Sequence, residues 1–437
     1  MGLSYQKLDK NPTFMQTLVS KKLSSNFDFR FQDVHMIVIK VTQKCNLDCA
    51  YCYENISSTG SNMSIGTFKK IIDKIIVSTT KKEVTLLFHG GEPSMLPNEW
   101  YEEAISYAIQ KGHTADIQFQ FAMQTNGLMP KSKIEFYAQK DINISISLDG
   151  PETIPQPMRD RTEKANLSYK RMKEAGLSPG VLMTINESNY AYQREILEWL
   201  EEEIDAKTFK ANIVYPVGEA YTSPPLEPEF IFWAQSEILE YMIQTRGEKI
   251  IEHNIAMAIL SLFGKASQRD SLCGSQTCGA GKQVLGITHE GNILPCGRFQ
   301  WDDPTYYKGS LNQVDQDFQS SQYKENYKEA LERFHHLVPE NWYNCKTCPA
   351  KDICSYGCQA FIVRNKSRAN VECLPTKMLY AKMSRLMEER PAEMQTTFKN
   401  IYARITSSQY RDTSYSDYGP SPYKDYSDHY ADFYKDR

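Results

Sequence analysis

Short apolar runs alternate with longer amphipathic stretches from about residue 34 to 245. The short runs are rich in β-branched residues and predict strands, because such side chains pack well on a pleated surface. The predicted strands are residues 34–41, 84–89, 117–123, 142–148, 181–185 and 209–215. Between them, apolar residues recur with the period of a helix, which predicts helices over residues 68–78, 99–111, 133–140 and 192–203.

Strands that alternate with helices indicate a parallel sheet with right-handed crossovers. Six such units predict an α/β fold, a partial (β/α)6 TIM-like barrel that stays open. In such folds ligands bind at the carboxyl ends of the strands. Polar motifs follow the first four predicted strands, namely CNLDCAYC, GGEP, QTNG and DGP. We therefore expect one site built from successive loops.

The same pattern divides the rest of the chain. Residues 227–262 and 376–403 predict further helices, and the segment between them is punctuated by Cys, Gly and Pro. We expect that segment to form a small domain ordered by metal ligation more than by a core. The expected parts are a lead-in (1–33), the barrel (34–245), a bridging helical segment (246–269), the cysteine-rich domain (270–378), a C-terminal helix (379–408) and a disordered tail (409–437).

Composition narrows the class of protein. The chain has 437 residues, of which 41% are hydrophobic and 24% charged, as in globular proteins. The net charge is −4 and no basic block stands out, so nucleic-acid binding is not expected. No apolar run approaches the ~20 residues that span a bilayer, and the start lacks the apolar core of a secretory signal. We expect a cytoplasmic protein that binds no membrane.

The cysteines are the most informative residues. There are eleven, an odd number, in two groups. Three lie close together at Cys45, Cys49 and Cys52, and eight follow a long gap. An odd count without a signal peptide indicates metal or redox chemistry rather than a disulfide framework.

The first group has the spacing Cys-x3-Cys-x2-Cys on one predicted loop. Soft thiolates at such short spacing suit an iron–sulfur cluster. Three cysteines on a 4Fe–4S cube leave one iron open for a small ligand. The alternative is a zinc site, which would require four ligands. The nearest histidine, His35, precedes the loop on a predicted strand and is expected to pack there.

The loop CNLDCAYCYE resembles the cluster loop of radical S-adenosylmethionine (SAM) enzymes, with Tyr51 as the aromatic residue of the pattern. The resemblance implies that SAM chelates the unique iron through its amino and carboxylate groups. It further implies that an electron from the cluster cleaves SAM to methionine and a 5′-deoxyadenosyl radical, which abstracts a hydrogen atom from the substrate.

The later loops resemble the family's SAM-binding motifs, although each tetrapeptide alone could be only a turn. GGEP matches the motif that binds the SAM amino group, where glycines permit close approach. Arg159 and Arg161 are candidates for pairing with the carboxylate of SAM or of a substrate, or for a solvated surface role. The SAM-binding residues implied by the resemblance are Tyr51, Gly90, Gly91, Glu92, Pro93, Gln124, Asn126, Ser147, Asp149 and Arg159.

The eight downstream cysteines are the number that two fully ligated 4Fe–4S clusters require. Their spacing resembles the SPASM domain, the auxiliary-cluster extension of radical SAM enzymes that modify peptides and proteins. The alternative is a pair of zinc knuckles. The resemblance implies one cluster on Cys273, Cys278, Cys296 and Cys358, and another on Cys345, Cys348, Cys354 and Cys373. Three clusters imply a reducing setting and an electron donor such as flavodoxin or ferredoxin.

Three functions remain open from the sequence. The first is a peptide maturase that forms crosslinks at aromatic residues. The second is an anaerobic sulfatase maturase, which oxidises Ser or Cys to formylglycine and usually carries an Asp base after the third auxiliary cysteine. That position is Gly297 here, which weakens this hypothesis and leaves the general base unnamed. The third is a non-catalytic iron–sulfur scaffold.

The tail from residue 410 repeats the triplet Tyr-x-Asp. It is nearly free of aliphatic residues, so we expect it to be disordered alone. The repeat resembles peptides in which a radical SAM/SPASM enzyme joins an aromatic ring to a β-carbon two residues on, giving a cyclophane. The six pairs are Tyr410 and Asp412, Tyr415 and Asp417, Tyr423 and Asp425, Tyr426 and Asp428, Tyr430 and Asp432, and Tyr434 and Asp436.

Two hypotheses fit this tail. It is either a solubilising or docking extension, or a substrate fused to its own modifying enzyme, where the linkage raises its effective concentration. The 44 residues before Cys45 are too few for a separate leader-recognition domain, which favours the second hypothesis. The expected substrate is therefore a peptide or protein, possibly the chain's own tail.

Overall fold

Nine strands form one sheet in the computed structural model, which describes residues 27–54, 56–222, 225–265, 278–300, 309–312, 317–336, 345–354, 357–364 and 370–407. Their order is β7-β6-β5-β4-β3-β2-β1-β8-β9, and all neighbours are parallel except β8 and β9. The strands are β1 (Met36–Thr42), β2 (Glu83–Gly90), β3 (Gln118–Thr125), β4 (Asn143–Ser147), β5 (Gly180–Ile185), β6 (Thr208–Ile213), β7 (Ile251–Glu252), β8 (Val284–Ile287) and β9 (Ile293–Leu294). The six predicted strands and the α/β partial barrel are confirmed.

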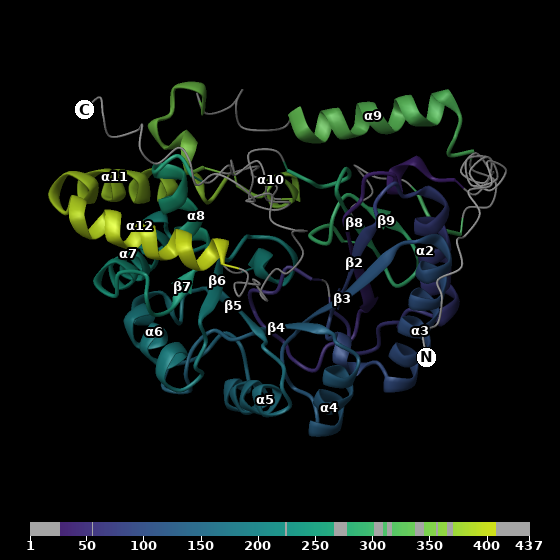
Figure 1. Cartoon of the computed structure of the whole chain (residues 1–437), viewed down its shortest axis with the longest axis horizontal. Coiled ribbons are helices and arrows are strands. Elements are labelled where there is room, and N and C mark those ends of the chain that lie inside the picture. Colours follow the sequence, from purple (N-terminus) through teal and green to yellow (C-terminus); the bar gives the residue numbers. More distant parts are fainter. Residues whose placement is uncertain are drawn as a thin grey trace, which may run out of the picture.

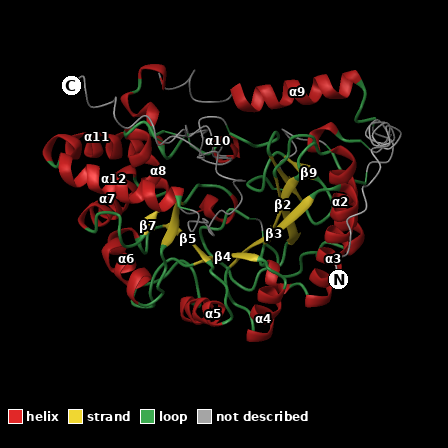
Figure 2. Cartoon of the chain, in the orientation of Figure 1, coloured by secondary structure: helices red, strands yellow, loops and turns green. Residues whose placement is uncertain are grey.

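Helices cover the outer face of this sheet (Figures 1 and 2). The α-helices are α2 (Ile65–Ser78), α3 (Asn98–Ala115), α4 (Lys131–Gln139), α5 (Thr162–Glu174), α6 (Gln193–Glu202), α7 (Pro228–Gln244), α8 (His253–Leu262), α9 (Ser321–His336), α10 (Gln359–Arg364), α11 (Cys373–Glu389) and α12 (Pro391–Thr406). Short 3-10 turns include η1 (Phe29–Phe31), η2 (Pro93–Met95), η3 (Tyr190–Tyr192), η4 (Gly218–Thr222), η7 (Cys345–Thr347) and η8 (Pro349–Asp352).

Helix α5 was absent from the sequence-based prediction. Its sequence, TEKANLSYKRMKE, is mostly polar, so the apolar period of a helix is weak. Its buried apolar side chains are Ala165, Tyr169 and Met172. Tyr169 follows Ala165 by four residues and Met172 follows Tyr169 by three, so all three lie on one face of the helix. The contact with the sheet, more than the sequence pattern, specifies this helix.

Two predicted helices are interrupted. The stretch 227–262 contains β7 between α7 and α8, because Ile251 and Glu252 pair with Thr208 and Phe209 at the end of the sheet. The stretch 376–403 lies within α11 and α12, which are separated at Arg390. Pro391 lies at the first position of α12, where its missing N–H costs nothing.

The cysteine-rich segment extends the barrel sheet. Strand β8 pairs in parallel with β1, and Met36 lies opposite Val284. Strand β1 therefore has neighbours on both edges, and all seven of its residues are buried. The six-strand expectation omitted this contact because β8 is only four residues long.

Some predicted features lie outside the described residues. These are Cys273, most of the lead-in (1–26) and the tail from residue 408, with all its Tyr-x-Asp triplets. Within the described part of the chain, no helix is long and apolar enough to cross a bilayer.

Candidate functional site

The loops that follow β1 to β4 meet around one cavity of about 410 Å³. Its lining includes residues of the first three polar motifs, among them Cys45, Glu92 and Asn126, and Ser147 at the end of β4, whereas no residue of the DGP motif lines it. Parallel strands end at the same edge of a sheet, so their following loops converge there. The cavity continues toward Cys296 and Cys358 of the cysteine-rich segment.

The three thiols of the first group lie on a single turn. The Cys52 N–H donates to the Cys49 carbonyl at 2.9 Å, and the Leu47 N–H approaches the Cys45 sulfur at 3.5 Å. The Asn126 amide from the loop after β3 also reaches the Cys45 sulfur, at 3.8 Å. The 3-10 turn η4 also contacts this turn, since the Glu219 N–H donates to the Cys52 carbonyl at 2.9 Å.

This donor set fits an iron–sulfur cluster. Burial raises the pKa of the Cys49 thiol to about 11 and that of Cys52 to about 12, so the thiolates require a strong positive partner. No group of three Cys, His, Asp or Glu in the described segments could hold a single metal ion. A structural zinc site takes four ligands, and this loop offers three cysteines. The thiol arrangement therefore favours a larger, multi-iron group over zinc.

The GGEP loop contacts the cysteine loop through its backbone. The Gly91 N–H donates to the Thr42 carbonyl at 2.9 Å, and the Glu92 N–H donates to the Lys44 carbonyl at 2.7 Å. A Cβ on Gly90 would lie 2.3 Å from the Thr42 oxygen, and one on Gly91 would lie 2.1 Å from the Lys44 oxygen. Glycine is therefore required at both positions.

The Glu92 carboxylate holds two loops together. It is fully buried, and it accepts hydrogen bonds from the Ser94 N–H at 2.9 Å, the Thr125 hydroxyl at 2.7 Å and the Asn126 N–H at 2.7 Å. Burial raises the pKa of Glu92, while these bonds oppose the rise. The side chain predicted to bind SAM thus has structural partners within the protein, and it also lines the cavity.

A second buried cluster supports the cysteine loop. Asp149 accepts hydrogen bonds from the Tyr51 hydroxyl, from Arg159 Nε at 3.1 Å and from the Thr184 N–H at 2.9 Å. Burial lowers the pKa of Arg159, but the adjacent Asp149 and Tyr51 raise it well above its ordinary range, so Arg159 stays charged. Arg161, the other candidate, is exposed at the start of α5 and is not among the cavity residues.

The remaining predicted SAM contacts divide into two groups. Gln124 and Ser147 line the cavity from the ends of β3 and β4. Pro93 begins η2 and is buried, and its carbonyl accepts a hydrogen bond from the Tyr101 hydroxyl at 2.7 Å. Pro93 is not among the cavity residues.

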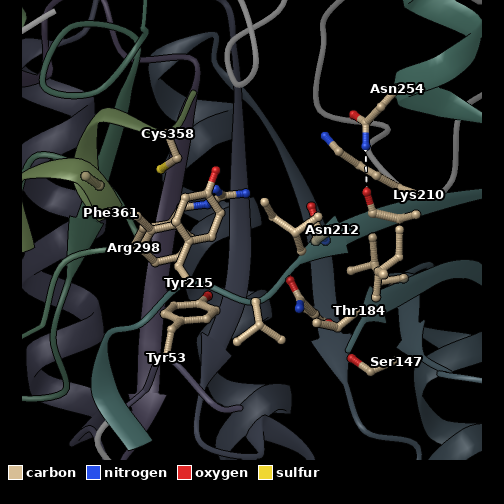
Figure 3. A pocket seen from close by; sticks show the side chains of 18 of the residues that line it. Tyr53, Ser147, Thr184, Lys210, Asn212, Tyr215, Asn254, Arg298, Cys358 and Phe361 are labelled. Atoms are coloured by element: carbon tan, nitrogen blue, oxygen red, sulfur yellow. Dashed lines mark hydrogen bonds between the residues drawn. The ribbon is translucent and has the colours of Figure 1, made fainter. Parts of the chain in front are cut away.

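Sequence reasoning missed the far side of the cavity, which Figure 3 shows. Two of these residues, Lys210 and Asn212, alternate with apolar residues on β6, and this polar alternation was the available signal. Tyr53 lies in the quoted CNLDCAYCYE loop, and His89 and Tyr215 end the predicted strands 84–89 and 209–215, but no motif marked these side chains as functional. The missed cavity residues include Tyr53, His89, Lys210, Asn212, Tyr215, Asn254, Arg298, Phe361 and Glu372.

His89 lies at the carboxyl end of β2 beside Tyr53. The Gly90 N–H donates to His89 Nδ1 at 2.7 Å, and His89 Nε2 lies 3.1 Å from the Tyr53 hydroxyl. Burial lowers the pKa of His89, which favours the neutral ring. With Nδ1 accepting, the hydrogen bonding assigns the proton to Nε2, which donates to Tyr53.

The cysteine-rich segment is anchored to the barrel by a buried polar network. Lys40 on β1 donates to Glu54 at 2.9 Å and to the Phe299 carbonyl at 2.6 Å. Gln300 also donates to Glu54, at 2.8 Å. These bonds hold the segment around Cys296 against the mouth of the barrel.

The structure describes seven of the eight predicted auxiliary cysteines. Cys278, Cys296 and Cys358 pack against one apolar cluster that includes Phe299 and Phe334. Their predicted partner Cys273 lies outside the described residues. For the other set, Cys345 begins η7, Cys348 caps η8, Cys354 follows η8, and Cys373 begins α11. Helix α11 contacts η8.

Comparison with known proteins identifies the barrel. The model of the radical SAM superfamily matches residues 39–200. These residues are a radical SAM domain. A 4Fe–4S cluster and SAM are the cofactors typical of such enzymes.

The radical SAM domain has curated relatives. The serine-type anaerobic sulfatase-maturating enzyme of Bacteroides thetaiotaomicron is 27% identical over 182 residues, covering 39% of this chain and 44% of that protein. The antilisterial bacteriocin subtilosin biosynthesis protein AlbA of Bacillus subtilis is 27% identical over 271 residues, covering 60% of this chain and 54% of that protein. The chain thus spans about half the length of these relatives.

A solved structure has the same fold. Native anSMEcpe with bound AdoMet and Cp18Cys peptide superimposes with a TM-score of 0.65 at 17% identity, covering 84% of this chain and 99% of that chain. The likeness therefore extends past the radical SAM domain into the cysteine-rich segment.

Proposed function

We propose that this protein is a radical SAM enzyme that modifies a peptide, and that it joins a tyrosine ring to the β-carbon of an aspartate two residues on. The observation that carries the proposal is the single cavity, which connects the three-thiol turn with cysteines of the cysteine-rich segment. A substrate in this cavity would touch both redox regions.

The residues of the first four loops would bind the cofactors. Cys45, Cys49 and Cys52 would hold a 4Fe–4S cluster, which with SAM supplies a hydrogen-abstracting 5′-deoxyadenosyl radical. Gly90 and Gly91 let the GGEP loop approach the cysteine turn, and Glu92 fixes that loop to the end of β3. The set proposed for SAM is Tyr51, Gly90, Gly91, Glu92, Pro93, Gln124, Asn126, Ser147, Asp149 and Arg159.

The eight later cysteines would hold two auxiliary clusters. The proposed sets are Cys273, Cys278, Cys296 and Cys358 for the first, and Cys345, Cys348, Cys354 and Cys373 for the second. Cys296 and Cys358 line the substrate cavity, which suits a centre that exchanges electrons with the substrate. An external donor such as flavodoxin or ferredoxin would supply the electrons that start turnover.

A peptide substrate is supported by the relatives. AlbA acts in the biosynthesis of a bacteriocin, subtilosin, and the anSMEcpe structure holds a peptide together with AdoMet. Joining the Tyr ring to the Asp β-carbon forms one C–C bond and removes two hydrogens. One leaves as a hydrogen atom to the radical, and the other as a proton and an electron, for which an auxiliary cluster is the acceptor.

The tail supplies the candidate substrate sequence. Its six Tyr-x-Asp triplets, between Tyr410 and Asp436, lie outside the described residues. We propose that they are modified by the same chain or mimic a separate peptide. A covalent link would raise the local concentration of a weakly bound substrate to the millimolar range for a short flexible linker.

Sulfatase-type maturation is the second candidate, favoured by the similarity to the sulfatase-maturating enzyme. The position of the expected Asp base is Gly297. A Cβ there would lie 2.5 Å from a methyl carbon of Val38 and 2.8 Å from its Cβ. Strand β1 therefore leaves no room for an Asp at residue 297 without a rearrangement.

Anaerobic reconstitution tests the proposal. The full chain should bind about twelve irons for three clusters and form 5′-deoxyadenosine with SAM and a reductant. Mass spectrometry should show a loss of two hydrogens per modified triplet in the tail or in an added Tyr-x-Asp peptide. Replacing Cys45, Cys49 and Cys52 by alanine is the matched control and should abolish both products. An unchanged mass despite 5′-deoxyadenosine formation would refute the crosslinking reaction.

A further inference from the structure

The cavity has two chemically different walls, which Figure 3 shows on opposite sides. On one side the ring centres of Tyr215 and Phe361 lie 4.3 Å apart, and those of Tyr53 and Phe361 lie 5.4 Å apart. On the other side lie Lys210, Asn212 and Asn254. A ligand with an aromatic ring at one end and an anion at the other would match both walls.

Lys210 faces the cavity because of the strand pattern. Side chains alternate between the two faces of a strand, and Phe209 and Ala211 belong to the main apolar core. Lys210 and Asn212 therefore point to the opposite face and line the cavity. Lys210 is only 5% exposed, and the buried carboxyl groups of Glu252 and Glu372 lie within its electrostatic range.

The surroundings of Lys210 are held by the fold. Asn254 donates to the Ala211 carbonyl at 2.7 Å, which fixes its amide beside β6. Glu252 accepts from the Ala211 N–H at 2.8 Å and from the Ile255 N–H at 2.7 Å, so it caps α8. The Lys210 charge lowers the pKa of Glu252 against the larger effect of burial, which shows that the two groups are within electrostatic range.

Arg159 is the cation beside the cysteine turn, and we assign it to the cofactor rather than to the substrate. Arg159 is paired with Asp149 at 3.1 Å and lies 5.5 Å from the centre of the Tyr51 ring, beside the cysteine turn. It is the cation placed to meet a cofactor carboxylate there. Lys210 on β6 and Arg298, whose Cζ lies 4.9 Å from the centre of the Phe361 ring, are further cations of the cavity, and neither belongs to the cysteine turn.

We propose that Lys210, together with Asn212 and Asn254, binds the side-chain carboxylate of an acidic residue in the substrate. The aromatic residue two positions earlier would pack against Tyr53, Tyr215 and Phe361. Three residues of extended chain span roughly 10 Å, which is the reach available to one triplet that contacts both walls. This inference rests on the proposed peptide-modifying function and names the residues that would recognise the acidic and the aromatic side chain of its substrate.

The test compares peptide binding without turnover. The full chain is reconstituted anaerobically with SAM but without reductant, with its six tail aspartates changed to asparagine in every sample. The probes are a peptide with the sequence of residues 421–429 and the same peptide with both aspartates changed to asparagine. The chain with Lys210 unchanged should bind the Asp peptide about tenfold more tightly than the Asn peptide, as a charge-assisted contact predicts.

The Lys210→Met variant should bind both peptides within about twofold of each other, because the charge-assisted contact is lost. Its affinity for SAM should be unchanged. Lys207→Met is the matched control, because the Lys207 side chain is 74% exposed and pairs with Asp205, and it should keep the preference for Asp. If Lys210→Met does not fold, Lys210→Gln serves for the same comparison.

Two results would overturn the inference. The first is the absence of the expected effect: either the Lys210→Met variant still prefers the Asp peptide, or the chain with Lys210 unchanged shows no preference for it. The other is a matching loss of SAM affinity, which would assign Lys210 to the cofactor. Because binding is measured without turnover, a chain that forms no crosslink but shows the Lys210-dependent preference would refute the proposed reaction and support this subsite.

Discussion

At the scale of single residues, glycines decide how the loops around the cavity fit together. The carbonyl oxygens of Thr42 and Lys44 accept hydrogen bonds from the backbone of the GGEP loop, and the space beside them is too small for a side chain. Buried charged residues also hold these loops in place: Glu92 accepts a hydrogen bond from the Asn126 N–H, and Asp149 pairs with Arg159.

We predict that Gly91→Ala reduces 5′-deoxyadenosine formation at least tenfold. The added Cβ would lie 2.1 Å from the Lys44 oxygen, so the GGEP loop must move away from the cysteine turn, at a cost of about 1–3 kcal/mol. The measurements are thermal unfolding and product formation. Gly66→Ala is the control, since its nearest neighbour is 3.7 Å away on exposed α2, and it should keep full activity. Equal behaviour of the two variants would contradict the prediction.

We predict that Gly297→Asp destabilises the fold without creating sulfatase-type oxidation. The new side chain would overlap Val38, and overpacking of this kind costs about 1–3 kcal/mol. Adding Val38→Ala should recover at least about 1 kcal/mol relative to the sum of the single effects. Denaturant unfolding of the four proteins measures this coupling. Formylglycine formation by Gly297→Asp would instead favour the sulfatase-type reaction.

At the scale of elements, strand β8 joins the cysteine-rich segment to the radical SAM domain. It pairs with β1 from Met36 to Ile39, and the Lys40 network adds buried hydrogen bonds at the same place. Without β8, the β1 edge would present unpaired N–H and C=O groups. The two parts of the chain are therefore expected to depend on each other for folding.

We predict that a chain ending at residue 265 aggregates, because it lacks β8 and exposes the edge of β1. A chain ending at residue 407 retains every described contact and should unfold at the temperature of the full chain. Light scattering and thermal unfolding compare the two. A monomeric, cooperatively folded chain of residues 1–265 would show that β8 is dispensable.

At the scale of the whole molecule, the apolar core is distributed unevenly. One large cluster of buried residues runs through the barrel and its helices, from Phe31 to Ile401. Three auxiliary cysteines, Cys278, Cys296 and Cys358, pack on a second cluster of five buried residues, Ala280, Leu294, Phe299, Phe334 and Ala360, and Cys348 and Cys358 also pack against the large cluster. The cysteine-rich segment adds few residues to the large cluster, among them Leu285, Ile353 and Phe361, so we expect it to depend on added ligation more than the barrel does.

We predict that anaerobic removal of iron lowers amide protection selectively. Backbone amides of residues 278–300 and 345–373 should exchange at least about tenfold faster, while those of β2 to β4 should be unchanged, because local opening depends on local packing. Hydrogen–deuterium exchange of the iron-loaded and iron-free chains measures this. Uniform loss of protection across the sheet would show that the metal stabilises the whole molecule.

The sequence alone determined the elements of the barrel and the loops of the site. Strand runs buried on both faces give continuous apolar segments, and the Cys-x3-Cys-x2-Cys and GGEP motifs are local patterns of thiols and glycines, so both can be read without a fold. The polar helix α5 and the four-residue β8 have no such local signal, and they were missed.

Only the tertiary structure decided what the loops do to one another. The Glu92 carboxylate accepts a hydrogen bond from Asn126 at the end of β3, and Val38 fills the space beside Gly297. Lys210 lies in the same cavity as the aromatic residues around Phe361. Each of these depends on segments far apart in the chain that meet at a few ångströms. Such distances are set by packing of the whole sheet, and no local pattern of residues records them.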